Sequence, residues 1–123
     1  MMKPLILITT LLTLSSNLYA EPVYEIVSTK FKEGIDYSTQ LQAMQTLDAL
    51  VSRFKGFESR HYYYSADLNR WTDIVTWQDE RLAVEASKHA FTNETALGVF
   101  SMMDEGSQIF SYNRLIGSLN KSK

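Results

Sequence analysis

Two histidines are the side chains of this sequence best suited to acid–base chemistry. His61 and His89 are the only histidines in the 123 residues. Because imidazole titrates near neutral pH, either one can serve as a general base. Each position also has a simpler explanation. His89 falls near the expected end of a helix, where the helix dipole favours a cation, and His61 falls on an expected strand, where it can be an exposed or interface imidazole.

A second group of chemically useful residues lies on an aromatic hairpin formed by segments 57–65 and 71–78. If Tyr64 pairs with Trp71, alternation along the two strands gathers six side chains on one face. These are Arg60, Tyr62, Tyr64, Trp71, Asp73 and Trp77. A register shifted by one residue would instead place Asp73 with Ser59, His61 and Tyr63.

The hairpin face has two interpretations. In the first, the guanidinium group and the indole rings anchor an aromatic acid or a phenol. The predicted ligand-binding residues are then Arg60, Tyr62, Trp71, Asp73 and Trp77. In the second, which we favour, Arg60 and Asp73 form an ion pair at a dimer interface and the tryptophans fill the core.

An oxygenase that needs no cofactor would require a base, an apolar pocket and a donor that stabilises developing negative charge. His61 or His89 is the candidate base, and Arg60 or a tyrosine hydroxyl is the candidate donor. Trp71 and Trp77 would form the walls. The spacing of these residues in the sequence does not by itself bring them together.

Several other chemistries are disfavoured. The chain has no cysteine and only two isolated histidines, so no zinc site is expected. No aspartate spacing indicates a calcium loop. The five glycines occur singly, at 34, 56, 98, 106 and 117, which leaves no phosphate-binding loop or dinucleotide fingerprint. We therefore expect no cofactor and no metal.

The hydrophobic pattern predicts the elements that must position these residues. Alternation predicts a first strand, and Asp36 then begins a helix with an apolar stripe that Lys55 and Gly56 end. After the hairpin, Asp79 and Glu80 open a second helix. A short helix capped by Thr92 or Asn93 follows, with Leu97, Phe100 and Met103 on one face. The ranges are 23–32 (strand), 36–56 (helix), 57–65 and 71–78 (hairpin), 79–90 (helix), 92–103 (short helix) and 107–115 (strand).

The element order predicts an α+β protein with the ferredoxin-like β-α-β-β-α-β sandwich. The four strands form an antiparallel sheet, and the helices cover one face. The other face carries large side chains and needs a cover, which a second copy of the chain would supply. We therefore expect a homodimer.

The first twenty residues are typical of a secretory signal peptide, with Lys3 before an apolar run and small polar residues before Glu21. The prediction is a signal peptide at 1–20, one domain at 21–117 and a flexible tail at 118–123, in a periplasmic or secreted protein that no membrane holds after cleavage. Of the 12 Lys and Arg residues only Lys3 precedes Glu21, so 11 basic groups face 14 acidic ones and the net charge is −3. That charge makes nucleic acid an unexpected partner.

The order of several motifs resembles the superfamily of antibiotic biosynthesis monooxygenase-like proteins. The resemblance rests on 24–27 (Tyr-Glu-Ile-Val), on Lys55-Gly56-Phe57 followed by Arg60, on 71–77 (Trp-Thr-Asp-Ile-Val-Thr-Trp) and on 100–104. It implies a dimeric α/β barrel with a pocket in each subunit between the sheet and its helices. It also favours the first of the two hairpin registers.

The resemblance leaves the activity open, because this fold hosts several functions. The first hypothesis is a protein that binds a small apolar or aromatic molecule. The second is a cofactor-independent monooxygenase that acts on an electron-rich aromatic or a quinol. The third is a non-catalytic interaction protein without a ligand pocket. Haem degradation is not expected, since the first strand offers Ser28 and Thr29 where that branch has an asparagine, and the second helix lacks a tryptophan.

Overall fold

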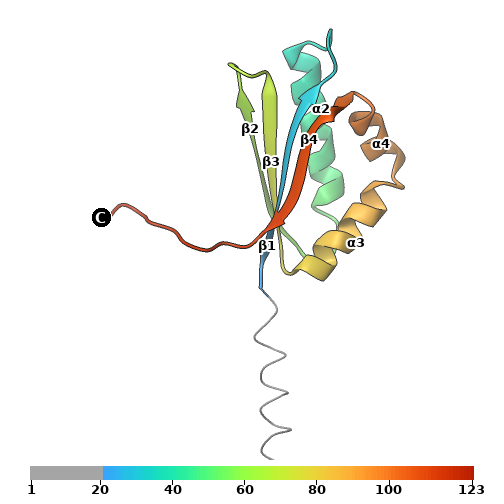
Figure 1. The fold of residues 1–123 in the computed structure, drawn as a ribbon. Helices are drawn as coiled ribbons and strands as arrows, with labels where there is room; N and C mark the ends of the chain where they lie inside the picture. The colour runs from blue at the N-terminus through green and yellow to red at the C-terminus, as the bar shows by residue number, and fades with distance from the viewer. Residues whose placement is uncertain (1–20) are drawn as a thin grey trace, which may run out of the picture.

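The computed structural model describes residues 21–123, which form one four-stranded sheet and three helices (Figure 1). The predicted signal peptide at 1–20 lies outside the described residues. In chain order the elements are β1 (Val23–Phe31), α2 (Tyr37–Val51), β2 (Phe57–Ser65), β3 (Arg70–Trp77), α3 (Glu80–Ala90), α4 (Glu94–Phe100) and β4 (Met103–Asn113). This order confirms the α+β, ferredoxin-like prediction, with the second helical segment divided in two.

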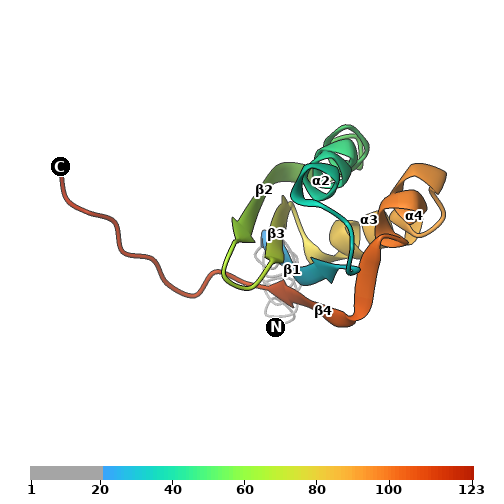
Figure 2. The ribbon, with the colours of Figure 1, turned by 90° about the horizontal axis from the view of Figure 1, so that it is seen from above.

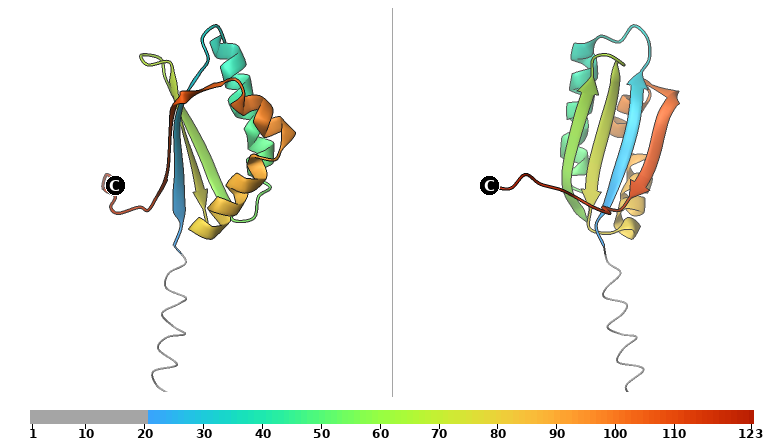
Figure 3. Two further views of the ribbon diagram at one scale, coloured as in Figure 1. Left: turned by 45° about the vertical axis from the view of Figure 1, so that its right-hand side comes forward. Right: turned by 60° about the vertical axis from the view of Figure 1, so that its left-hand side comes forward.

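The sheet has the strand order β2-β3-β1-β4, and every neighbouring pair is antiparallel. The first strand of the chain is therefore central, while β2 and β4 form the edges. All three helices lie on one face of the sheet, as the view from above and the edge-on view both show (Figures 2 and 3). The opposite face carries no element of residues 21–123.

The hairpin adopts the first of the two predicted registers. Tyr64 pairs with Trp71, Tyr62 with Asp73 and Arg60 with Val75. Because side chains alternate along a strand, the six predicted hairpin residues share the face that the helices cover. Asp73 therefore does not share a face with His61.

The start of α2 agrees with the sequence, but its end does not. The Asp36 side chain accepts a hydrogen bond from the backbone N–H of Thr39, so Asp36 is the expected N-cap. The helix ends at Val51, before the predicted stop at Lys55 and Gly56. Gly56 does have a positive φ of 90°, but its carbonyl accepts from Gln78 N–H, so the glycine shapes the entry to β2 instead of capping the helix.

The second half of the chain contains two further corrections. Asp79, which was expected to open the second helix with Glu80, is the N-cap of α3, and Asn93 is the one of the two expected residues that caps α4. The buried face of α4 is formed by Ala96 and Val99, so the predicted face of Leu97, Phe100 and Met103 is wrong. Met103 instead opens β4, which begins four residues earlier than predicted because it pairs with Phe31 beyond an irregularity between Ser28 and Lys30.

The core lies between the sheet and the helices and has two parts. One is built around Trp71 and Met44 and contains the end of β1 and α4. The other is built around Trp77, Val75 and the alanines of α3. Helix α2 borders both parts. Beyond β4, residues 114–123 run away from the body without regular structure (Figure 1).

Candidate functional site

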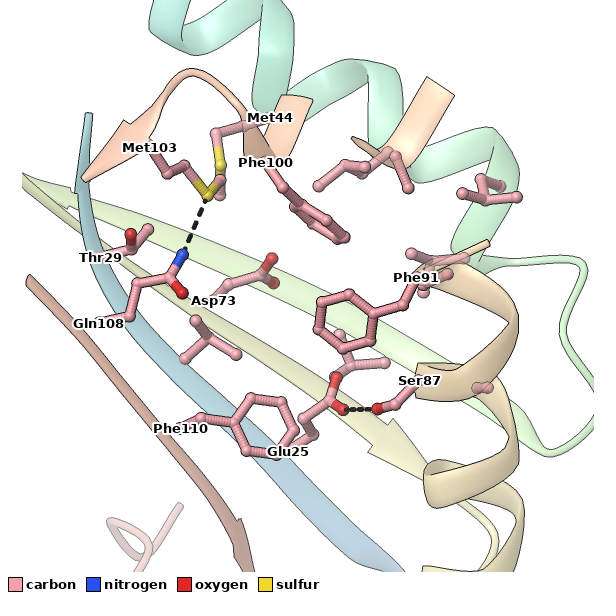
Figure 4. A pocket seen from close by; sticks show the side chains of 18 of the residues that line it. Glu25, Thr29, Met44, Asp73, Ser87, Phe91, Phe100, Met103, Gln108 and Phe110 are labelled. Atoms are coloured by element: carbon pink, nitrogen blue, oxygen red, sulfur yellow. Dashed lines mark hydrogen bonds between the residues drawn. The ribbon is translucent and has the colours of Figure 1, made fainter. Parts of the chain in front are cut away.

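A cavity of about 380 Å³ lies between the sheet and the helices. Volumes from about 300 Å³ upward are typical of pockets that hold small organic ligands. The walls are mainly apolar, and Figure 4 shows the rings of Phe91, Phe100 and Phe110 with Met44 and Met103 around the cavity. The polar exceptions are few, and Glu25, Asp73 and Ser87 are the ones whose contacts bear on chemistry.

Strand alternation explains how the polar groups reach an apolar cavity. Along β1 the odd positions face the helices, so Glu25 is placed between Val23 and Val27. On β3 the same rule places Asp73 beside Val75. The two carboxylates are diagonal neighbours on one face, because Glu25 pairs with Val75 and Val27 pairs with Asp73.

Glu25 is the side chain whose acidity the cavity changes most. Burial raises its pKa from 4.5 to about 7, and the negative charge of Asp73 adds to this increase. The Ser87 hydroxyl opposes it by donating a hydrogen bond of 3.2 Å to the Glu25 carboxylate (Figure 4). The carboxyl group therefore exchanges its proton near neutral pH.

A short hydrogen-bonded chain continues from Glu25 to the sheet edge. The Ser87 Oγ lies 3.1 Å from the hydroxyl oxygen of Tyr112 on β4. Ser87 has a single hydroxyl hydrogen, which it donates to Glu25, so Tyr112 is the donor in the second bond. Burial raises the Tyr112 pKa, and the negative charge of Glu25 also favours its protonated form.

Trp77 adds an unused donor to this part of the cavity. Its indole N–H acts on Glu25 as a lesser cause that lowers the carboxyl pKa. Nevertheless it forms no hydrogen bond of ordinary geometry within residues 21–123, although the side chain is only 2% exposed. The donor is thus close to a carboxylate and still free to bind an acceptor atom.

Asp73 differs from Glu25 because it has a fixed partner. The guanidinium group of Arg60 binds it through Nη2 to Oδ2 at 2.8 Å and through Nε to Oδ1 at 3.1 Å. The same guanidinium group donates to the Met44 carbonyl and to Asp48 on α2. Burial disfavours the Arg60 charge, but Asp73 and Asp48 together outweigh it and raise the pKa of Arg60.

The predicted ligand-binding residues separate into two groups. Asp73 and Trp77 line the cavity, whereas Arg60, Tyr62 and Trp71 do not. The Arg60–Asp73 ion pair of the favoured interpretation exists, but it lies beneath α2, away from the open sheet face where a second copy would bind. Trp71 donates to Gln40 and packs in the core, and Tyr62 donates to Asp48.

Neither predicted base faces the cavity. His61 is exposed and lies on the open face of the sheet, since its neighbours Arg60 and Tyr62 face the helices. His89 is exposed near the end of α3, where its ring lies 6.1 Å from that of Phe54. It lines a separate shallow cleft together with Arg53 and Lys55. The structure therefore does not bring the histidines together with Asp73 and Trp77.

The sequence analysis missed Glu25, Ser87 and Tyr112. One signal for Glu25 was present, because it is a charged residue at an inward position of an alternating strand whose other inward positions are apolar. No sequence signal identifies Ser87 or Tyr112, which reach Glu25 from α3 and β4 only through the tertiary fold.

Within residues 21–123, no cluster of three or more His, Asp or Glu side chains has an arrangement that suits a metal ion. In the same part of the chain, none of the helices combines the length and the apolar character needed to cross a membrane.

Comparison with known proteins extends the description of the fold. No protein-family model matches the sequence, and no curated protein sequence matches it significantly. Among solved structures, SnoaB from Streptomyces nogalater, described as a cofactor-independent oxygenase, is similar with a TM-score of 0.69 at 14% identity, over 83% of this chain and 100% of SnoaB. The chain has the fold of the antibiotic biosynthesis monooxygenases.

Two further structures support this monooxygenase-like fold. A protein from Bordetella bronchiseptica, provisionally assigned as an antibiotic biosynthesis monooxygenase, has a TM-score of 0.67 at 17% identity, over 78% of this chain and 98% of its own. A protein from Arabidopsis thaliana has a TM-score of 0.66 at 13% identity, over 80% and 99%. The resemblance seen in the sequence is thereby confirmed for the fold.

Proposed function

We propose that this protein binds a small apolar or aromatic molecule in the cavity between its sheet and its helices. The observation that carries the proposal is the cavity of about 380 Å³, whose aromatic and aliphatic walls surround a few polar groups. A protein with only an interaction role would have filled this space with side chains. The cavity therefore favours a ligand over the third hypothesis.

A cofactor-independent monooxygenase acting on an electron-rich aromatic or a quinol is the second candidate function. One observation favours it, namely that Glu25 offers the cavity a carboxyl group with a pKa of about 7. A base of this kind can take a proton from a substrate near neutral pH. The similarity to SnoaB concerns the fold alone and leaves the choice between binding and catalysis to experiment.

The test is a thermal-shift screen of the purified protein against phenols, quinols and aromatic amines and acids. A ligand of the cavity is expected to raise the melting temperature of the wild type. It should lose this effect in Ala90→Phe, which fills the cavity from the end of α3. Ala49→Phe, on the exposed surface of α2, is the matched control and should respond like the wild type.

Two outcomes oppose the proposal. If no compound stabilises the wild type, or if Ala90→Phe responds as Ala49→Phe does, the cavity is not a ligand site. Oxygen consumption with each stabilising compound then separates the two candidate functions. Uptake that depends on the compound and on Glu25 supports the monooxygenase.

The proposal includes a periplasmic or secreted homodimer. The signal-like sequence at 1–20 supports export. The open sheet face supports self-association, because Tyr63 and Ile109 project from it with 59% and 66% of their surfaces exposed. The mass of the mature protein, if it begins at Glu21, tests the first part.

A further inference from the structure

The charges around the cavity all have one sign. Among residues 21–123, its lining includes the carboxylates of Glu25, Asp73 and Glu105 and no lysine, arginine or histidine. Arg60 contacts the lining residue Asp73, but its guanidinium group is already bound by Asp73 and Asp48 and by the Met44 carbonyl. The carboxylates would repel an anionic ligand, and a neutral ligand would leave the charged form of Glu25 buried without a cation.

The aromatic rings in the cavity walls also favour a cation. Phe91 and Phe100 come from the ends of α3 and α4, with ring centroids 5.6 Å apart, and Phe110 comes from β4. Figure 4 shows these three rings around the space that Glu25 also faces. Aromatic faces attract cations through their quadrupole, and this attraction is larger where water is excluded.

Trp77 supplies an observation independent of charge. Its buried indole N–H lines the same cavity and has no hydrogen-bond partner within residues 21–123. A buried donor without a partner is rare in native structures, and a ligand atom is one way to satisfy it. The unpaired donor indicates, as the apolar walls do, that a ligand enters the space beside Glu25.

We infer that the ligand of this cavity is an amphipathic organic cation, a primary or secondary amine on an aromatic or alkyl body, whose ammonium group binds Glu25 and Asp73. The inference rests on the proposed function, which it narrows to one chemical class. The two carboxylates are diagonal neighbours on adjacent strands, so one ammonium group lies within reach of both. Its N–H donors would add charge-assisted hydrogen bonds to the one that Ser87 gives Glu25 and to those that Arg60 gives Asp73.

The binding should depend on pH through Glu25. The groups that face it are Asp73 and Trp77 on β3, Ser87 on α3 and Tyr112 on β4. Glu80 at the start of α3 adds negative charge near Tyr112. Below a pH of about 7 the Glu25 carboxyl group is protonated, and its attraction for an ammonium group disappears. Amine affinity should therefore fall as the pH is lowered from 8 to 6.

The experiment compares three probes of one shape by isothermal titration calorimetry at pH 8. These are 1-naphthylmethylamine, 1-naphthylmethanol and 1-naphthylacetate, which are cationic, neutral and anionic. The wild type should bind the amine about tenfold or more tighter than the alcohol, as expected for one added charge-assisted hydrogen bond. It should bind the acetate most weakly. At pH 6 the advantage of the amine should shrink severalfold.

Variants assign the preference to the cavity. Glu25→Gln should lower the amine affinity to within a fewfold of the alcohol affinity, remove the pH dependence and leave the alcohol affinity nearly unchanged. Glu58→Gln, an exposed change on β2, should behave as the wild type. Unchanged binding of the alcohol also shows that Glu25→Gln retains the fold and the cavity.

The outcomes separate the two proposals. Equal binding of amine and alcohol by the wild type, or an amine preference that survives Glu25→Gln, overturns the organic-cation inference and leaves the ligand-binding function standing. Tighter binding of the acetate overturns it as well. If none of the three probes binds and the wider screen also finds no ligand, the proposed function fails and the inference fails with it.

Discussion

Glu25 occupies an inward position on the central strand β1, where its neighbours on the same face are apolar. Desolvation makes its charged form expensive, and the resulting pKa of about 7 lies well above the 4.5 of an exposed glutamate. Because the folded protein holds the proton more tightly than the unfolded chain, Glu25 favours folding below pH 4.5. That contribution is lost as the pH rises through 7.

Replacing Glu25 with glutamine should therefore stabilise the protein at alkaline pH. The amide keeps the shape of the protonated acid but never ionises, so the gain should reach about 1 to 3 kcal/mol at pH 8 and be small at pH 5. Urea unfolding of wild type and Glu25→Gln at the two pH values measures the difference. An equal effect at both would contradict the assigned acidity.

Arg60 illustrates the opposite case, a buried charge with partners on every side. Its side chain is 3% exposed and bridges β3 to α2 through Asp73 and Asp48. Arg60→Met should destabilise the fold by about 3 to 5 kcal/mol, because Asp73 would be left without its partner. Asp48→Asn should cost less than about 1 kcal/mol, since that side chain is 53% exposed. Chemical denaturation compares them, and similar losses would be the unexpected result.

Strand alternation predicted the Arg60–Asp73 pair only in the first of two hairpin registers, the one that the family resemblance favoured. The pattern could not predict whether the face with this pair lies under the helices or on the open side of the sheet. For this reason the pair was assigned to a dimer interface. The histidines were chosen for their intrinsic pKa. The cavity lining contains Glu25, whose pKa of about 7 results from burial, and burial cannot be calculated from the sequence alone.

At the scale of the elements, starts were easier to predict than ends. Asp36 and Asp79 are short acidic side chains at helix N-termini and were identified from type and spacing. The end of α2 was misplaced because a glycine such as Gly56 is typical of a helix stop. In the structure Gly56 follows the helix by several residues and contacts another element. It lies against Leu82 of α3, where a Cβ atom would come within 2.7 Å of that side chain.

Gly56 and Gly34 form a natural pair for testing this account. Both have a positive φ, but a Cβ at Gly34 would meet nothing within 4 Å. Gly34→Ala should cost about 1 kcal/mol through backbone strain alone. Gly56→Ala should cost about 2 kcal/mol more, because Leu82 must also move. Thermal and urea unfolding measure both changes in stability. Equal losses of stability would show that Leu82 and α3 move aside at no cost.

At the scale of the whole molecule, the sheet has a covered face and an open face. The order of the elements and their hydrophobic periodicity predicted the fold and its layers. The similar solved structures support the fold and nothing finer. The existence of a cavity was implied by the family resemblance. The polar lining of the cavity was not predicted, because Ser87 and Tyr112 lie 62 and 87 residues after Glu25 in the chain.

Self-association through the open face is testable with one charge. Ile109 on the edge strand β4 is 66% exposed. If a second copy covers this face, Ile109→Arg should shift the protein from dimer to monomer in light scattering coupled to size-exclusion chromatography. Leu68→Arg, 59% exposed in the hairpin turn, is the control and should remain dimeric. A wild type that is monomeric at all accessible concentrations would refute the homodimer.

The central position of β1 determines when, during synthesis of the chain, the sheet can be completed. The helix α2 and the β2–β3 hairpin involve neighbours in sequence and can assemble while the chain is still being synthesised. Strand β1, however, must pair with β4 (Met103–Asn113), which is synthesised after every other described element of the sheet. Until then one edge of β1 stays open to foreign strands. Completion of this sheet therefore waits for the synthesis of β4, and a nascent chain paused before residue 103 should bind chaperones that a chain containing β4 escapes.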